Sequence, residues 1–459
     1  MKTLTTRELK EQLASLQGTE VTLRGWIRNH RKQKNMGFID FFDGMCFKNP
    51  QVVYDQNIAD FEKIQALHVG AAVQVTGTVV PSYKDPETPE IQASAIVLEG
   101  DCPEDYPLQP KKHSLEYLRE IAYLRPRTRL FQAVFRVRSV AAMAIHTYFQ
   151  DRGYVYVHTP LITGNDAEGA GNTFTVTTLT PEERAAGQED FFGKNTSLAV
   201  TGQLEGETFA MAFSRIYTFG PTFRAENSNT KTHAAEFWMI EPEIAFCDLN
   251  QLMDIEEDFL KAIVGTVLEK CPDELAFLDK FSGGGLTDKL KALLTSQCAR
   301  ITHEEAITIL RKAMENGTEF KFEPQYGGDT AKEHEKYLTE EYFHSPVFVY
   351  DWPKEIKAFY MYQNDDGKTV SAVDLLVPGA GELMGGSQRE HRYDLLEQRM
   401  DEMGVSKKDM YWYLNLRKFG SCVHAGFGMG FERLVMYLTD IENIRDVLPY
   451  PRTPGNCEF

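Results

Sequence analysis

The sequence lacks the cysteine spacing of a zinc or disulfide protein. Its seven cysteines, at positions 46, 102, 247, 271, 298, 422 and 457, form no C-x-x-C pair. We therefore expect reduced thiols and a cytoplasmic location. No stretch approaches the roughly 18 uninterrupted apolar residues of a transmembrane helix, and the charged amino-terminal segment lacks the apolar run of a secretion signal. We expect neither a membrane span nor a secretory leader.

The chain also lacks an excess of basic residues. It has 49 Lys and Arg against 67 Asp and Glu, a formal net charge of −18. This balance argues against a generally basic, histone-like binder of nucleic acid, although it leaves room for a local basic patch. Internal repeats and low-complexity tracts are absent. With 459 residues, we expect more than one domain.

Residues 20–100 predict a small β-barrel. Short strand-like runs follow one another here, separated by turn signals: "EVTLRGWIRNHRKQ", "GFIDFFDG", "PQVVYDQ", "AAVQVTGTVVPS" and "EIQASAIVLEG". Prolines at 103, 107 and 110 then indicate a linker. We assign residues 1–103 to a barrel domain and 104–128 to a linker or hinge.

Residues 129–459 predict a larger α+β domain. A helix-period segment from Thr128 leads into the strand-like "YVYVHTPLIT", and strand and helix patterns then mix to the end of the chain. We expect a largely antiparallel sheet flanked by helices. Residues 270–345 are more helical and more polar, and we interpret them as an insertion.

Three segments of this domain carry candidate chemistry. "FRAENSNTKTHAAEFWMIEPE" (223–243) predicts a hairpin with Arg224 and Glu226 on one strand face. "CVHAGFGMGFERLVMYL" (422–438) has glycines at 426, 428 and 430 before a helix that contains Arg433. "SAVDLLVPGAGELMGGSQRE" (371–390) places two acids, Asp374 and Glu382, around a Pro-Gly turn, where they could hold Mg²⁺. Taken singly, each pattern also has a structural interpretation. The first is compatible with a structural ion pair, the second with turn glycines and the third with solvated hairpin acids.

Together these segments resemble one family. "FGPTFRAENSNT", "HAAEF" and "GFGMGFERLVMYL" are similar to motifs 2 and 3 of class II aminoacyl-tRNA synthetases, and "RGYVYVHTPLIT" is similar to motif 1. "FWMIEPEIAF", "PGAGELMGGSQRE" and "NIRDVLPYPRTPGN" resemble the bacterial asparaginyl-tRNA synthetases in particular. The resemblance runs along essentially the whole chain. It implies an OB-fold barrel that binds the anticodon, a class II catalytic domain and a homodimer formed through motif 1.

The resemblance implies roles in ATP binding. Arg224 would contact the α-phosphate and the amino-acid carboxylate, and its planar, permanently charged group suits two anions. Glu226 would accept from the adenine amine, His233 would reach the terminal phosphate, and Phe237 and Arg433 would enclose adenine. Asp374 and Glu382 would position Mg²⁺ on the phosphates. Arg224 and Arg433 are the expected catalytic residues.

The family positions also predict the amino-acid pocket. Glu168 would accept from the substrate amine, assisted by Gln203, and Arg389 would donate to the side-chain amide oxygen. In "VTGQLEGE", Gly206 occupies the place of a lysine that aspartyl enzymes carry, and Glu207 follows it. A glutamate there would accept from an amide and repel a carboxylate, which favours asparagine over aspartate. Glu205 and Glu207 share strand parity and so a strand face, which leaves the choice between them open on the residues alone, and the family position favours Glu207.

A local basic patch interrupts the acidic chain in the barrel. "RGWIRNHRKQK" contains Arg24, Arg28, Arg31, Lys32 and Lys34, and Phe38 and Gln51 follow on the next strands. Basic groups beside an aromatic are typical of single-stranded RNA binding. The resemblance implies that Phe38 and Gln51 stack on and hydrogen-bond the middle anticodon base, with Arg28 nearby. Without it, Phe38 would be read as a core residue.

The sequence therefore predicts an asparagine–tRNA ligase that uses ATP and Mg²⁺ to form asparaginyl-adenylate and acylate the 3′-terminal adenosine of tRNA(Asn). Three alternatives stay open: an aspartyl or non-discriminating ligase, an ammonia-dependent asparagine synthetase, and a catalytically silent RNA-binding paralogue. Gly206 and Glu207 argue against the first, and the barrel argues against the second. The complete set of ATP-binding residues argues against the third. The apolar helix around Val134–Phe149 fits either a dimer interface or an internal core.

Overall fold

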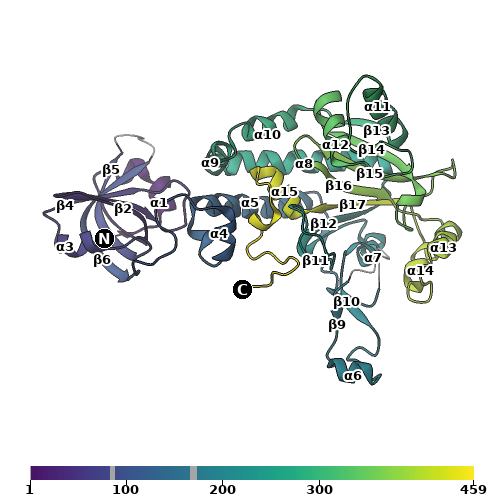
Figure 1. The fold of residues 1–459 in the computed structure, drawn as a ribbon, viewed down its shortest axis with the longest axis horizontal. Helices are drawn as coiled ribbons and strands as arrows, with labels where there is room; N and C mark the ends of the chain where they lie inside the picture. The colour runs from purple at the N-terminus through teal and green to yellow at the C-terminus, as the bar shows by residue number, and fades with distance from the viewer. Residues whose placement is uncertain (1, 83–87, 166–172) are drawn as a thin grey trace. The chain divides into compact units, whose positions relative to one another are not determined.

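The chain divides into two compact units, Met1–Phe135 and Arg136–Phe459 (Figure 1). The computed structural model describes residues 2–82, 88–165 and 173–459. Within these residues no helix combines the length and apolar character needed to cross a membrane.

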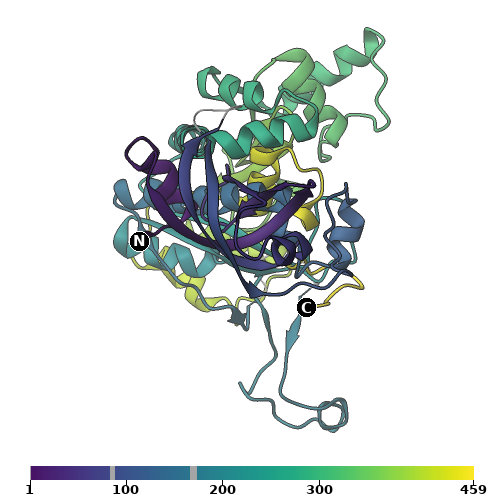
Figure 2. The same ribbon diagram turned by 90° about the vertical axis from the view of Figure 1, so that its left-hand side faces the viewer.

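Unit 1 is the expected barrel. Its strands are β1 (Lys2–Thr3), β2 (Glu20–Lys32), β3 (Met36–Phe42), β4 (Gln51–Asp55), β5 (Ala72–Pro81) and β6 (Pro89–Gly100), in the order β1-β2-β3-β4-β6-β5. Pairing of β2 with β5 closes the barrel, and its purple and blue strands curl around one centre in Figure 2. The helical segments of the unit are α1 (Thr6–Glu11), α2 (Leu13–Leu16), α3 (Phe61–Ala66), α4 (Leu115–Glu120) and the start of α5 (Arg129–Asp151).

Alternation along the strands separates the barrel core from its outer face. On β3, Ile39 and Phe41 are fully buried, whereas Phe38 and Asp40, which alternate with them, are partly exposed. Gly37 is required because a side chain there would collide with the ring of Tyr54. The register places Arg31 of β2 opposite Phe38, and Gln51 of β4 opposite Asp40. Arg31, Phe38 and Gln51 therefore share the outer face of the barrel.

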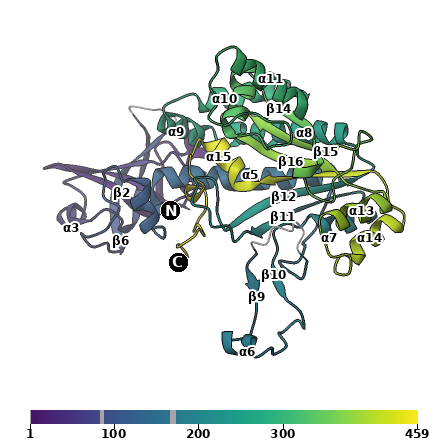
Figure 3. The same cartoon turned by 45° about the vertical axis from the view of Figure 1, so that its right-hand side comes forward.

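Unit 2 contains the main sheet, eight strands in the order β13-β14-β15-β16-β17-β12-β11-β7 (Figure 3). All neighbours are antiparallel except β13 with β14 and β11 with β7. The expected α+β class is confirmed. The strands are β7 (Val155–Tyr156), β11 (Arg215–Phe223), β12 (Glu236–Ala245), β13 (Ala299–Thr302), β14 (Val347–Pro353), β15 (Thr369–Val377), β16 (Gly381–Gln388) and β17 (His424–Gly430). The strand expected over 154–163 is divided into two short strands, β7 and β8 (Ile162–Thr163), and Pro160, which cannot donate to a ladder, lies between them.

Helices cover the sheet on both sides. The described helices of unit 2 beyond α5 are α6 (Pro181–Ala185), α7 (Gln203–Phe213), α8 (Leu249–Lys270), α9 (Pro272–Ser282), α10 (Leu286–Thr295), α11 (His303–Glu315), α12 (Lys332–Lys336), α13 (Tyr393–Glu402), α14 (Tyr411–Lys418) and α15 (Phe431–Thr439). Asp248 caps α8 through a capping box with Gln251. α8 then packs across β15, β16 and β17, and its buried apolar residues form much of the core beneath the sheet.

Two additions extend from this body. The expected insertion holds α9 to α12, and its strand β13 adds to the edge of the main sheet beside β14. A separate three-stranded sheet, β8 (Ile162–Thr163), β10 (Thr196–Leu198) and β9 (Thr175–Val176), carries α6 on a projecting arm (Figure 3). Most apolar side chains of α5 are buried within the chain: Val134, Val137, Ala141, Ile145 and Phe149. These side chains pack as core, although Met143 on the same helix is exposed.

Candidate active site

The site lies on the face of the main sheet opposite α8. Side chains alternate along a strand, so Phe237, Met239, Glu241 and Glu243 of β12 project to one face. The glycines of β17 make room on this face. A side chain at Gly426 would collide with the carboxylate of Glu243, and one at Gly428 would press against Met239. Two glycines of the G-x-G-x-G pattern, Gly426 and Gly428, therefore leave space on the sheet face for the side chains of the site.

The residues expected to bind ATP line a cavity of about 250 Å³. Its lining includes Arg224, Glu226, His233, Phe237, Glu382 and Arg433. Arg224 and Glu226 follow the end of β11 instead of lying on it, which corrects the expectation of one strand face. The guanidinium of Arg224 lies 5.5 Å from the centre of the Phe237 ring. Three segments distant in sequence thus converge on one cavity, as expected of a nucleotide site.

Polar contacts hold the turn between β11 and β12, both within the turn and to a residue near the end of the chain. His233 Nδ1 hydrogen-bonds the hydroxyl of Thr230, and Lys231 forms an ion pair with Glu442 at 2.6 Å. Partial burial lowers the pKa of His233, with Arg433, Lys332 and Arg224 acting in the same direction and Glu226 opposing them. Neutral His233 among several cations is suited to an anionic ligand, which would favour its protonated form.

The two expected metal ligands meet above one glycine of β16. A Cβ atom built on Gly385 would lie 3.3 Å from Oδ1 of Asp374 and 3.4 Å from Oε1 of Glu382. Desolvation in the cleft, together with the carboxylate of Asp374, raises the pKa of Glu382 to about 7. Asp374 is balanced by Lys357 at 3.0 Å. No group of three or more His, Cys, Asp or Glu side chains in the described ranges is arranged to hold a metal.

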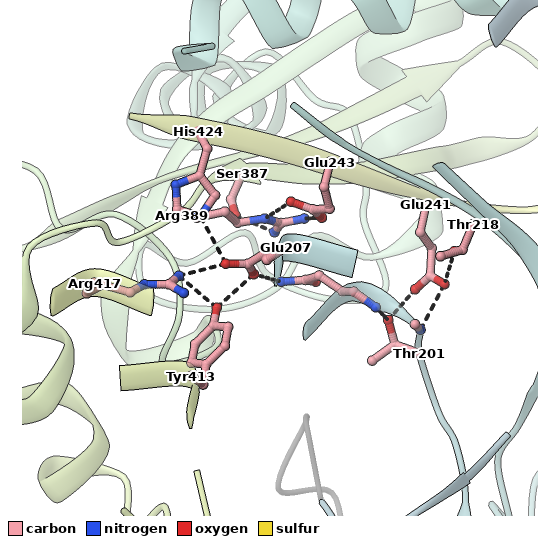
Figure 4. Close-up of polar contacts among 12 residues, drawn as sticks. Thr201, Glu207, Thr218, Glu241, Glu243, Ser387, Arg389, Tyr413, Arg417 and His424 are labelled. Atoms are coloured by element: carbon pink, nitrogen blue, oxygen red, sulfur yellow. Dashed lines mark hydrogen bonds and ion pairs between the residues drawn. The ribbon is translucent and has the colours of Figure 1, made fainter. Parts of the chain in front are cut away.

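Glu207 is the centre of a buried polar network (Figure 4). Its side chain has no exposed surface, and it accepts four hydrogen bonds. The donors are Gln203 Nε2 at 3.2 Å, Tyr413 Oη at 2.7 Å, Arg417 Nη2 at 2.7 Å and His424 Nε2 at 2.9 Å. Burial alone would raise the pKa of Glu207, but Arg417 and His424 hold it well below its usual range. Glu207 is therefore a carboxylate at neutral pH.

Glu205 and Glu207 both lie on α7 and point in different directions. The segment 203–213 is a helix, so the assumption that both glutamates share a strand face is wrong. Residues two apart on a helix point in very different directions. Glu205 is partly exposed, and desolvation raises its pKa. The fold thus places only Glu207 in the network.

Arg389 lies beside this network with a carboxylate partner of its own. Nε and Nη2 of Arg389 both donate to Glu243, and Nη1 donates to Ser387 Oγ at 2.8 Å (Figure 4). Arg389 is almost fully buried, and its guanidinium lies 5.4 Å from the centre of the Tyr360 ring. Glu168, expected to bind the substrate amine, lies outside the described residues. Gln203 is at the first turn of α7 and contacts Glu207.

Sequence reasoning missed the residues that hold Glu207 and Arg389 in place. Tyr413 and Arg417 stand four residues apart on α14, His424 begins β17, and Glu243 lies on β12. The spacing of Tyr413 and Arg417 predicts a shared helix face. Nothing in the sequence, however, indicates which acid that face would meet.

In unit 1 the candidate RNA-binding residues differ in accessibility. Arg28 is mostly buried: it donates to Gln132 at 2.7 Å and lies 4.3 Å from the centre of the Phe42 ring. Burial lowers its pKa to about 10. Phe38 is partly exposed, with Arg31 at 5.2 Å from its ring centre. Of these two, Phe38 is better placed to contact a base.

Comparisons with known proteins agree with this geometry. A family model described as tRNA synthetases class II (D, K and N) matches residues 114–454, and one described as an OB-fold nucleic acid binding domain matches residues 21–99. An asparagine–tRNA ligase of Acholeplasma laidlawii is 56% identical over 99% of this chain and 100% of its own length. One of Alkaliphilus oremlandii is 53% identical over all of both chains.

A solved structure is similar over the same length. The asparaginyl-tRNA synthetase of Pyrococcus horikoshii, complexed with asparaginyl-adenylate, has a TM-score of 0.86 and 32% identity, covering 99% of each chain. The predicted family and fold are confirmed. The chain belongs to the class II tRNA synthetases of the D, K and N group, and within that group to the asparagine–tRNA ligases.

Proposed function

We propose that this site activates asparagine with ATP and transfers it to the 3′-terminal adenosine of a tRNA. In the first step an oxygen of the asparagine carboxylate attacks the α-phosphorus of ATP. The bond to the bridging oxygen breaks, and pyrophosphate leaves with the bonding electron pair. In the second step a ribose hydroxyl attacks the acyl carbon and AMP leaves. Both steps depend mainly on alignment and charge neutralisation.

The state of Glu207 is the observation that carries the choice of asparagine. Its carboxylate is ionised and lies in a buried pocket of donors. The bond from Gln203 is the longest of the four and comes from a side-chain amide like that of the substrate. The substrate amide can therefore replace it. The carboxylate of aspartate has no hydrogen to donate, and Glu207 would repel it.

The residues of the 250 Å³ cavity account for nucleotide binding. Arg224 is placed to bridge the α-phosphate and the asparagine carboxylate, and Glu226 to accept from the adenine amine. Phe237 and Arg433 line the same cavity, where adenine can lie between the ring and the guanidinium. His233 accompanies the terminal phosphates.

Asp374 and Glu382 fit a magnesium ion shared with the phosphates. Their carboxylates meet over Gly385, and their mutual repulsion contributes to the raised pKa of Glu382. Mg²⁺ typically takes one or two protein carboxylates and completes its shell with phosphate oxygens and water. When bound, the ion supplies charge neutralisation on the phosphates.

For the RNA we propose the outer face of the barrel in unit 1. Phe38 offers a partly exposed ring, Gln51 pairs with Asp40 two residues further along β3, and the guanidinium of Arg31 lies over the ring. Single-stranded loops are commonly bound by stacking of bases on such rings. Arg28 is engaged inside the unit, and we propose that it positions Phe42 and the surrounding barrel instead of contacting phosphate.

We also propose a homodimer. The short strand β7 is an edge of the main sheet, and its Tyr156 is 47% exposed. Met143 of α5 and Trp238 of β12 are exposed as well. Exposed apolar residues near a free sheet edge are typical of an interface between copies. Sedimentation of the purified protein would test this: a single species with the mass of one chain contradicts it.

The function is tested by pyrophosphate exchange with asparagine, with aspartate and with no amino acid in parallel. The expected result is exchange that depends on asparagine and is weak with aspartate. Equal exchange with both amino acids would instead indicate a non-discriminating ligase, and tRNA binding without any exchange would indicate a silent paralogue.

A further inference from the structure

A second cavity opens beside the nucleotide cavity in unit 2. It measures about 450 Å³, and the two share Thr232, Glu382, Leu383 and Arg433 in their linings. We call this second cavity the annex. Because of the shared residues, the annex lies where the triphosphate of ATP would extend out of the adenosine pocket. The annex is therefore continuous with the expected path of the β- and γ-phosphates.

Three lysines line the annex: Lys231, Lys289 and Lys332. Lys231 forms an ion pair with Glu442 at 2.6 Å, and Lys289 forms one with Asp440 at 3.0 Å. Lys332 is exposed and has no ion-pair partner among the residues that the structure describes. Its ammonium group is thus a cation available to an anionic ligand in the annex.

Lys332 is held in place by the insertion to which it belongs. It is the first residue of α12, and Glu335 follows it by three positions, on the same helix face. Glu335 Oε2 accepts from the backbone N–H of Glu382 at 3.1 Å. Further along, Glu340 Oε1 accepts from the backbone N–H of Gly379 at 3.0 Å. Two glutamates therefore fasten the insertion to the β15–β16 turn.

The approach of α12 to this turn is close. Gly381 has a φ of +75°, and a Cβ atom there would lie 2.2 Å from Oε2 of Glu335. Any side chain at 381 would displace the carboxylate, and the backbone conformation also favours glycine. The contact fixes α12 directly beside Glu382, the expected ligand of the metal and of ATP.

We propose that Lys332 binds the terminal phosphates of ATP and the pyrophosphate formed from them. This makes the insertion at 270–345 part of the reaction site, and it rests on the function proposed above. The lysine ammonium neutralises charge on the leaving group as the bond from the α-phosphorus breaks; it takes part in no covalent step. A compact cation on a flexible stem suits a group that must also depart.

The test compares Lys332→Gln with Lys336→Gln in the full-length protein. Lys336 is on the same helix and does not line the annex; it faces Glu340 at 3.9 Å on the surface. In Lys332→Gln the KM for ATP and for pyrophosphate should each rise about tenfold, the loss expected for one charge-assisted contact. The KM for asparagine and inhibition by AMP, which lacks the terminal phosphates, should not change. Lys332→Arg should recover most of the loss, and Lys336→Gln should match the wild type.

Three results would overturn the proposal. The first is a KM for ATP and pyrophosphate within about twofold of the wild type. The second is weaker inhibition by AMP in the same proportion, since that would indicate a general disturbance of the cavity. The third is normal exchange with a defect only in transfer to tRNA, which would assign Lys332 to RNA phosphates. Absence of asparagine-dependent exchange in the wild type would refute the proposed function instead, so the two failures are distinguishable.

Discussion

Glu207 and Arg417 lie 2.7 Å apart in the interior of unit 2, although 210 positions separate them in the chain. Neither side chain is more than 1% exposed. A buried charge pair of this kind is favourable only when further hydrogen bonds complete it, and Tyr413, Gln203 and His424 do so. The buried network therefore holds a fixed negative charge. This fixed charge is the basis of the proposed selection of asparagine over aspartate.

Replacement of Glu207 by Gln should abolish most asparagine-dependent exchange and reduce discrimination against aspartate. The amide places a donor where Arg417 and His424 also donate, and it removes the charge that repels aspartate. We expect the asparagine-to-aspartate ratio of kcat/KM to fall at least about tenfold. Glu205→Gln on the same helix serves as the control. An unchanged ratio in Glu207→Gln, with a changed ratio in the control, would assign the selection to Glu205.

Tyr413→Phe should weaken asparagine binding without changing the KM for ATP. The substitution removes the hydrogen bond that Tyr413 Oη donates to Glu207 and the one that it accepts from Arg417 at 2.9 Å, and it leaves the ring in place. Such bonds contribute about 1.5–3 kcal/mol. We expect the KM for asparagine in pyrophosphate exchange to rise about tenfold or more. If the KM for ATP rises equally, Tyr413 supports the whole site and not the amino-acid pocket.

Arg433→Ala should severely reduce adenylate formation and leave tRNA affinity nearly unchanged. The residue lines the nucleotide cavity from the first turn of α15 and contacts Glu382. We expect exchange to fall by about a hundredfold or more, as for removal of one electrostatic contact to a transition state. Arg300→Ala, an arginine paired with Asp254 in the same unit, is the matched control. Near-normal exchange in Arg433→Ala would contradict its role.

Glu256→Gln should make the protein more stable at pH 8 and leave its stability nearly unchanged near pH 4. Glu256 on α8 is fully buried, and neither of its carboxylate oxygens has a hydrogen-bond partner among the residues that the structure describes. Burial, together with Asp374, raises its pKa well above the usual value. Folding therefore takes up a proton between the unfolded pKa of about 4.3 and the raised folded value, so stability falls as pH rises through that window.

The gain for Glu256→Gln at pH 8 should be about 2 kcal/mol or more, because each pH unit between the unfolded and the raised folded pKa of Glu256 contributes about 1.4 kcal/mol. Thermal unfolding at both pH values would measure it. A gain of equal size at pH 4 would show that the carboxyl group does not titrate in this range.

Phe38→Ala should weaken tRNA binding while pyrophosphate exchange stays normal. A base stacked on an aromatic ring contributes about 1–3 kcal/mol, so the Kd for tRNA should rise about tenfold. Phe281→Ala, an exposed phenylalanine on α9, is the control. Filter binding of tRNA would measure both, and an unchanged Kd in Phe38→Ala would exclude the proposed stacking.

Much of this protein is determined by local sequence. Alternating runs predicted the barrel strands of unit 1 within a few residues, because strand periodicity and turn residues are local signals. The segments containing Arg224, Phe237 and Arg433 indicated a nucleotide site through their resemblance to family motifs, each of which is contiguous in the chain. The structure brings these residues to one cavity, and their roles in nucleotide binding stay predictions.

The tertiary structure alone decided which charges meet. Sequence reasoning placed Glu205 and Glu207 on one strand face, but α7 turns only Glu207 inward, where α14 and β17 supply Arg417, Tyr413 and His424. Long-range pairing of this kind depends on how helices pack on the sheet, which no local pattern encodes. The same holds for Lys332, whose insertion had no evident role in the sequence. The hydrogen bonds that Glu335 and Glu340 accept from the backbone N–H groups of Glu382 and Gly379 bring the insertion to the β15–β16 turn, and Lys332 with it to the annex.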